Sequence, residues 1–192
     1  MRTNVYFIRH AESRTNKDPL SDVMEDCLTE CGLKQAELVA LSLKDIKIEK
    51  IFTSKVLRAK ITGAKIGEAV NIEPTQLEYL KERRGTHDIN LNYVYTESFE
   101  YFKMRLEETK SFLESLSSNK HIVVVSHSAF LKGLFSYIML GDLLTEDSAS
   151  KIDRVMVVDN ASVSKFTYNH EKQKWHSEYL NDRHSINSIT SL

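Results

Sequence analysis

Two short runs of branched and aromatic residues constrain the fold of this chain more than any other feature. They span residues 5–8 and 122–125, and neither shows a polar residue at alternate positions. A continuous apolar run of this length is typical of a strand that is buried on both faces of a sheet. Each run also ends in polar residues that include a histidine, Arg9-His10 after the first and Ser126-His127 after the second. Buried strands of this kind require helices over both faces of their sheet.

The segments around these two runs alternate between helical and strand-like patterns. Apolar residues at helical spacing predict helices in four segments, 28–46, 56–70, 97–117 and 129–140. Short apolar or alternating runs predict further strands at 47–54, 76–80, 155–159, 161–169 and 174–180, the last two forming a hairpin. We therefore expect an α/β fold, a three-layer sandwich with a mostly parallel central sheet and helices on both faces.

Length and charge limit the organisation and the partners of the chain. A length of 192 residues without an internal linker favours one domain over residues 1–192, with a frayed polar tail at 181–192. The formal net charge of −1 provides no overall basic field, so we expect no nucleic-acid partner and no membrane partner. No apolar stretch approaches the roughly 18 residues of a membrane span. The sequence contains no pattern that indicates an oligomeric state.

The two cysteines bear on the compartment. Cys27 and Cys31 are four residues apart, and no second Cys/His pair with zinc-like spacing follows them. Arg9 and His10 interrupt the N-terminal apolar run after a few residues, which argues against a signal peptide. Since two thiols suit a reducing compartment, we expect a cytoplasmic protein.

Polar residues with chemical potential follow three of the predicted strands. In α/β sheets, ligands bind beyond the carboxyl ends of the strands. That edge would collect Arg9-His10, residues 54–58 and residues 126–128. Singly, a histidine at a strand end is usually structural, and an arginine on a first helical turn usually faces water. Together, two histidines and two arginines at one sheet edge suit a phosphate, because guanidinium groups match its oxygens.

This combination also suits covalent chemistry at phosphorus. A neutral imidazole can attack a phosphoryl group, and neighbouring guanidinium groups disfavour its protonated form. Its second ring nitrogen would need an acceptor, such as a backbone carbonyl, to fix the tautomer. A protonated second histidine, His127, would stabilise the charge of the transition state. No carboxylate cluster suits magnesium, so we expect no metal and no cofactor.

The segments that carry these residues resemble the histidine phosphatase superfamily, also called the phosphoglycerate-mutase-like family. "FIRHAESRTN" is similar to its strand and Arg-His-Gly-Glu-Thr-x-x-Asn signature, and "LTECGLKQA" to its Leu-Thr-x-x-Gly-x-x-Gln-Ala helix. "IFTSKVLRAKITG", "VVVSHSAFLKGL" and "NASVSKFTY" resemble its later elements, so the matches run in order from Val5 to about Tyr168. The resemblance implies that His10 is the phosphorylated nucleophile. It also implies phosphate-binding roles for Arg9, Arg58, His127, Asn16 and Ser128.

The sequence departs from the family pattern at three places. Ala11 and Ser128 stand where glycines are frequent, and Ala11 is tolerable if its φ is negative. The family usually has Leu-x-Glu followed by a glycine and Trp-Glu-Gly, and the Glu of this pattern is its proton donor. Here "LKE" fits the start of the pattern, but no Trp-Glu-Gly follows. We assign Glu82 as the general acid, which calls for a raised pKa. Glu78 and Asp88 are the alternatives, and Glu82 could instead be a solvated partner of Arg83 or Arg84.

The sequence thus predicts a metal-independent phosphatase that hydrolyses phosphomonoesters through a phosphohistidine on His10. The enzymatic alternatives are phosphoglycerate-mutase-type phosphoryl transfer and protein-phosphohistidine phosphatase activity. A phosphate-ligand-binding scaffold without turnover is the non-enzymatic alternative. We expect a small phosphorylated metabolite as substrate. Residues that would line the mouth of the site are Lys17, Arg83, Arg84, Tyr93, Tyr95 and Tyr101.

Overall fold

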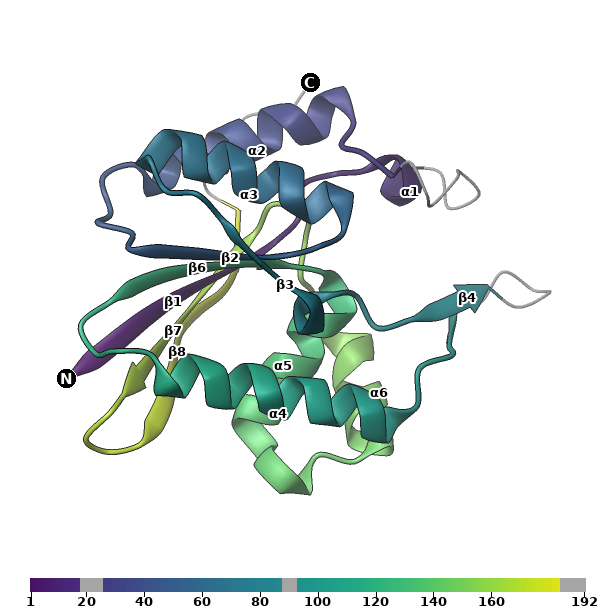
Figure 1. Ribbon diagram of the computed structural model, residues 1–192. Helices are drawn as coiled ribbons and strands as arrows, with labels where there is room; N and C mark the ends of the chain where they lie inside the picture. Colours follow the sequence, from purple (N-terminus) through teal and green to yellow (C-terminus); the bar gives the residue numbers. More distant parts are fainter. Residues whose placement is uncertain (18–25, 88–92, 184–192) are drawn as a thin grey trace.

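A six-stranded mixed sheet forms the middle layer of the protein (Figure 1). The structure is a computed structural model that describes residues 1–17, 26–87 and 93–183. The strand order is β3-β2-β6-β1-β7-β8, in which the first four strands run parallel and β7 and β8 are antiparallel to their neighbours. The bounds are β1 Arg2–Arg9, β2 Lys50–Ser54, β3 Thr75–Leu77, β6 His121–Ser126, β7 Val163–Asn169 and β8 Lys174–Asp182.

Helices cover both faces of this sheet, which confirms the predicted three-layer sandwich. Helices α2 (Glu30–Leu43) and α3 (Leu57–Val70) lie together on one face (Figure 1). Helices α4 (Phe99–Ser115), α5 (Ser128–Leu140) and α6 (Glu146–Val155) lie on the other face. A short helix, α1 (Arg14–Lys17), follows β1.

The two apolar runs are buried on both faces because successive side chains of a strand point in opposite directions. Val5 and Phe7 of β1 belong to the core cluster under α4 and α5, where the Phe7 ring meets the edges of Phe135 and Phe166. Tyr6 and Ile8 belong to the second cluster, under α2 and α3. Residues 122–125 of β6 alternate in the same way.

A close backbone contact fixes the start of α2 against the segment that follows β1. Thr29 caps the helix, since its Oγ1 accepts a hydrogen bond from the N–H of Gly32 and donates one to Glu12. A Cβ atom at Gly32 would lie 1.9 Å from the backbone oxygen of Glu12, so only glycine fits there without a shift. The start of α2 is thereby packed against the backbone of Glu12, two residues after His10.

Two predicted strands differ from the structure, and one helix was not predicted. Residues 155–159 do not form a strand, and β7 is the antiparallel strand that pairs with β1. Val155 instead ends α6, the helix that the sequence analysis missed. The predicted strand 76–80 is β3 followed by a 3₁₀ turn over Glu78–Leu80.

Two further differences lie near the ends of other segments. A two-stranded sheet, β4 (Gly85–His87) with β5 (Tyr93–Tyr95), was not predicted. Residues 181 and 182, predicted to belong to a frayed tail, instead form the end of β8, and the Asn181 side chain bonds with Asp159. Residues 184–192 lie outside the described residues. Within the described part of the chain, no helix is both long enough and apolar enough to cross a membrane.

Candidate active site

The carboxyl ends of three adjacent strands bring the predicted site residues together. In the sheet, β1 lies beside β6 and β6 beside β2, with Arg9 opposite Ser126 and Thr53 opposite Val125. The next residues in the chain, His10 and His127, therefore lie side by side, with their ring centres 5.1 Å apart. Arg58, in the first turn of α3, reaches the same place from the end of β2.

The His10 side chain is buried and held at both ring nitrogens. Its Nδ1 lies 2.8 Å from the backbone oxygen of Ala11, and its Nε2 lies 3.0 Å from Nε of Arg58. A carbonyl oxygen only accepts and a guanidinium only donates, so Nδ1 carries the proton and Nε2 carries the lone pair. The backbone carbonyl expected from the sequence is thus that of Ala11, whose φ is not positive.

Burial and positive neighbours hold His10 in its neutral form. Burial lowers the pKa of His10 well below its usual value, and the charges of Arg58 and Arg9 lower it further. The hydrogen bond to Ala11 works in the opposite direction and is the smaller effect. The nucleophilic form of the imidazole is therefore present at neutral pH.

The two arginines approach His10 from different elements. Nη1 of Arg9 donates to the backbone oxygen of Val158 at 2.8 Å, and the buried Nε of Arg9 has no hydrogen-bond partner within residues 1–17, 26–87 and 93–183. Nη1 of Arg58 donates to the carboxylate of Asp26 at 2.9 Å. Arg9 is thus anchored at Nη1, and Arg58 is held at Nη1 by Asp26 and at Nε by His10. The arrangement suits the binding of phosphoryl oxygens by the donors that remain.

His127 differs from the protonated form expected from the sequence. Its Nε2 lies 2.9 Å from Oγ of Ser54, and its buried Nδ1 has no hydrogen-bond partner among the described residues. Burial, followed by His10 and Arg58, lowers the pKa of His127 well below its usual value. His127 is therefore neutral in this state of the site. A phosphoryl dianion beside it would favour the protonated form, because an opposite charge raises a histidine pKa.

The side chain of Glu82 lies at the N-terminus of α5, the helix that begins directly after His127. Its Oε1 accepts from the N–H of Phe130 at 2.9 Å and from its neighbour Arg83 at 3.0 Å, and Oε2 accepts from Ala129 at 3.4 Å. Burial raises the pKa of Glu82 despite these hydrogen bonds and despite Arg58. The raised pKa is the property that a general acid requires.

The alternatives for Glu82 fit the structure less well. The guanidinium of Arg83 pairs with Glu146 and not with Glu82. Glu78 is exposed between Lys55 and Lys81, and the Lys81 hydrogen bond lowers the pKa of Glu78. Asp88 lies outside the described residues. Among the described candidates, Glu82 is the carboxyl group with the environment of a proton donor.

Asn16 and Ser128 lie at the margin of this cluster. The Asn16 side chain is exposed, and its Oδ1 accepts from Nδ2 of Asn160 at 2.9 Å. The same amide of Asn160 donates to the backbone oxygen of His10 at 3.0 Å. Ser128 is partly buried and begins α5 beside His127. Both predicted residues are therefore near the histidines, with Asn16 linked to His10 through Asn160.

Asp26 is the site residue that the sequence analysis missed. It is buried, and its carboxylate accepts hydrogen bonds from Arg58, Ser13 and Thr15. It stands in a polar connection without periodicity, two residues before Leu28, so no local pattern distinguishes it from a surface aspartate. Only the spatial proximity of α3 reveals its partner.

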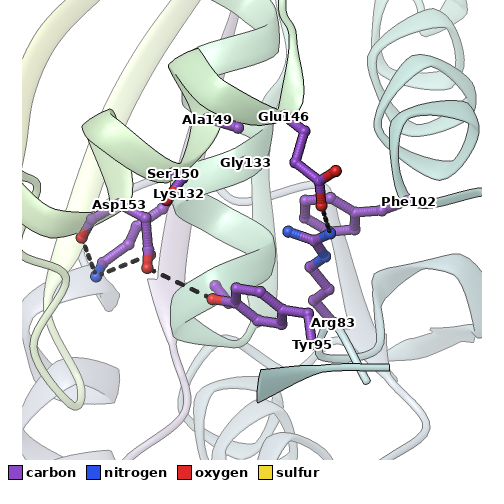
Figure 2. Close-up of a pocket in the computed structure, with 10 residues that line it drawn as sticks. Arg83, Tyr95, Phe102, Lys132, Gly133, Glu146, Ala149, Ser150 and Asp153 are labelled. Atoms are coloured by element: carbon purple, nitrogen blue, oxygen red, sulfur yellow. Dashed lines mark hydrogen bonds and ion pairs between the residues drawn. The ribbon is translucent and has the colours of Figure 1, made fainter. Parts of the chain in front are cut away.

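A cavity of about 130 Å³ lies between residues of α5, α6 and the segment that follows Glu82 (Figure 2). Ala129, whose N–H bonds Glu82, lines it together with Arg83, the residue after Glu82. The Arg83 guanidinium lies 4.1 Å from the ring centre of Tyr95 and 3.3 Å from Glu146. On the other wall, Lys132 pairs with Asp153 at 3.1 Å. The cavity therefore has walls of both charges.

Other predicted residues take different places. Of the residues expected at the mouth, Arg83 and Tyr95 line this cavity, whereas Lys17, Arg84 and Tyr101 are exposed. Tyr93 begins β5. Cys27 and Cys31 are free thiols. Among the described residues, no three His, Cys, Asp or Glu side chains are grouped so as to hold a metal ion.

Comparison with protein families gives one match. The model of the histidine phosphatase superfamily (branch 1) matches residues 5–87 and 83–183, which is most of the chain. No curated protein matches the sequence.

Several solved structures share the fold at low sequence identity. Phosphoserine phosphatase from Entamoeba histolytica, in complex with 3-phosphoglyceric acid, has 21% identity and a TM-score of 0.78 over 96% of this chain and 99% of that one. A putative alpha-ribazole-5'-P phosphatase from Escherichia coli has 20% identity and a TM-score of 0.76, covering 94% and 97%. A mycobacterial glucosyl-3-phosphoglycerate phosphatase has 15% identity and a TM-score of 0.70, covering 95% and 100%.

Proposed function

The chain belongs to the histidine phosphatase superfamily, and from that membership we propose that it hydrolyses phosphomonoesters through a phosphohistidine on His10. The observation that carries this proposal is the state of His10. Its Nδ1 is bound to a carbonyl oxygen, its Nε2 has a lone pair, and Arg9 and Arg58 stand beside it. A neutral imidazole held among guanidinium groups is suited to attack phosphorus.

In the first step, the phosphoryl group replaces Nε2 of His10 as the partner of Arg58. Nε2 attacks phosphorus, a nitrogen–phosphorus bond forms, and the bond from phosphorus to the leaving oxygen breaks. Glu82 gives its proton to that oxygen, so the leaving group departs as an alcohol. The donors of Arg9, Arg58 and His127 stabilise the charge on the equatorial oxygens.

In the second step, water replaces the departed alcohol. The Glu82 carboxylate takes a proton from this water, whose oxygen attacks phosphorus as the nitrogen–phosphorus bond breaks. Inorganic phosphate leaves, and His10 returns to its neutral form. No step calls for a metal or an organic cofactor.

We place the leaving group of the substrate in the cavity beside Glu82. Its paired charges, Arg83 with Glu146 and Lys132 with Asp153, suit a small polar group more than an extended apolar one. The named activities of the similar structures, toward phosphoserine, alpha-ribazole phosphate and glucosyl-3-phosphoglycerate, also concern polar phosphorylated molecules. The substrate class is therefore a small, polar phosphorylated metabolite. The two free thiols support a reducing location, such as the cytoplasm.

Hydrolysis of p-nitrophenyl phosphate in the presence of a chelator tests this function. The wild-type protein is expected to release phosphate steadily, and His10→Ala is expected to lose turnover while circular dichroism and Tm show an intact fold. Phosphate binding without turnover by the wild-type protein would instead support a scaffold. A panel with 3-phosphoglycerate and a phosphohistidine peptide then separates hydrolysis of metabolites from mutase and phosphohistidine phosphatase activity.

A further inference from the structure

The carboxylate of Asp26 accepts a hydrogen bond from Nη1 of Arg58, whose Nε donates to His10. We propose that Asp26 is a positioning residue that sets the orientation of the Arg58 guanidinium for phosphoryl transfer. This inference rests on the proposed function, because it assigns Asp26 a part in the same reaction. Asp26 itself has no contact with His10 and acts through Arg58.

The contacts of Arg58 support this role. Its Nη1 donates to Oδ2 of Asp26 at 2.9 Å, while its Nε donates to Nε2 of His10 at 3.0 Å. The Asp26 side chain is 1% exposed and that of Arg58 is 12% exposed. A charge-assisted hydrogen bond shielded from water has a strong preference for one geometry. One end of the guanidinium is thus fixed while the other end faces the nucleophile.

Catalysis requires Arg58 to change partners without losing its position. In the structure its Nε donates to the lone pair of His10 that must attack phosphorus. The arriving phosphoryl group must therefore take over that donor. If Nη1 stays bound to Asp26 during this exchange, the guanidinium keeps its place beside His10.

Asp26 also binds the segment that follows His10. Its Oδ1 accepts from the N–H of Thr15 at 3.0 Å, and its Oδ2 accepts from the hydroxyl groups of Thr15 at 2.6 Å and Ser13 at 3.1 Å. These bonds fix the carboxylate so that it can serve as a rigid anchor for Arg58. They also supply the competing explanation, that Asp26 only holds α1 in place.

A double-mutant cycle on p-nitrophenyl phosphate hydrolysis distinguishes these explanations. Asp26→Asn is expected to lower kcat/KM roughly 10- to 100-fold, the scale of a misplaced catalytic group. In an Arg58→Ala background the same substitution is expected to change kcat/KM by less than about twofold, since coupled residues are non-additive. An equal loss in both backgrounds, or no loss in the wild-type background, would overturn the proposal.

Controls separate folding defects from loss of positioning. Thr15→Val removes one hydroxyl bond to Asp26 and leaves the Arg58 pair, so it is expected to retain more activity than Asp26→Asn at an equal or larger fall in Tm. If both variants lose activity in proportion to Tm, Asp26 is only structural. Glu49→Gln removes the charge of a more exposed ion pair, with Lys120, at the opposite end of β6, and is expected to leave activity unchanged.

The same assays show which proposal fails. His10→Ala measured alongside must be inactive for the proposed function to stand. If His10→Ala is inactive but the cycle is additive, the phosphatase mechanism holds and only the role of Asp26 is wrong. If His10→Ala keeps its activity, the proposed function is wrong, whatever the cycle shows.

Discussion

His10 and His127 are the same residue type at the ends of neighbouring strands, yet their hydrogen bonds give them different chemistry. His10 is fixed by a carbonyl at Nδ1 and a guanidinium at Nε2, which determines its tautomer. His127 has one hydroxyl partner, Ser54, at Nε2. These hydrogen bonds support the proposed roles, with His10 as the nucleophile and His127 as a group that binds a phosphoryl oxygen.

Arg58→Ala is expected to reduce transition-state stabilisation by at least about 3 kcal/mol, the scale for loss of one donor to developing charge. The substitution removes the guanidinium that contacts His10 and leaves Asp26 without its partner. Steady-state kinetics with an aryl phosphate measures the effect as kcat/KM. A change of less than about threefold, or about 0.65 kcal/mol, would exclude Arg58 from the site.

Glu82→Gln is expected to slow the hydrolysis of alkyl phosphates more than that of p-nitrophenyl phosphate, because a poor leaving group needs a proton and a good one does not. Burial raises the pKa of Glu82, so its acid form persists to a higher pH than for an exposed glutamate. Wild-type activity on alkyl phosphates should then fall as the pH rises through that raised pKa. Equal slowing of both substrates by the variant would point to another acid.

At the scale of elements, the strands were easier to predict than the connections. The runs 5–8 and 122–125 are apolar throughout because both faces of β1 and β6 are buried, so composition alone identified them. Residues 155–159 have a similar composition but form no strand, since Val155 ends α6 and β7 is the strand that pairs with β1. Val155 is 78% exposed, which local sequence does not reveal.

The residues of the candidate site also divide into those that the sequence predicted and those that it did not. The predicted residues stand at the end of a strand or at the start of a helix, and they are Arg9, His10, Arg58 and His127. Asp26 was not predicted, because its role comes from a contact with Arg58, 32 residues further along the chain. The cavity wall formed by α6 was also missed, because the sequence analysis assigned no helix to residues 146–155.

Gly32→Ala tests how α2 supports the site. The added Cβ would lie 1.9 Å from the Glu12 backbone oxygen, so α2 and the segment after His10 must separate. The expected cost is about 1–3 kcal/mol in the free energy of unfolding, with a fall in kcat. Urea denaturation and kinetics measure both. Lys34→Ala, on the exposed side of α2, is the control, and an unchanged Gly32→Ala protein would contradict the packing.

At the scale of the whole molecule, the site makes the fold sensitive to acid. His10 and His127 are buried and their pKa values are lowered in the folded state, mainly by burial. A histidine with a lowered folded pKa adds stability above its unfolded pKa and loses it as the pH falls below that value. Stability should therefore decrease below about pH 6.5, by up to about 1.4 kcal/mol per pH unit for each histidine.

Urea denaturation at a series of pH values measures this loss. The variant His127→Asn removes one of these histidines. It should reduce the slope of the unfolding free energy against pH between neutral pH and the onset of acid unfolding. The absolute stability of the variant is compared separately. An identical slope in His127→Asn and the wild type would show that His127 is not held neutral by the fold.

The central claim is that His10 itself accepts the phosphoryl group during turnover. Rapid quenching of the wild-type protein with labelled substrate under alkaline conditions, followed by peptide mass spectrometry, observes this intermediate directly, since acid would destroy a phosphohistidine. The account predicts a phosphate on His10 that appears within one turnover and is absent in His10→Ala. An enzyme that releases phosphate while His10 stays unmodified at every quench time would contradict it.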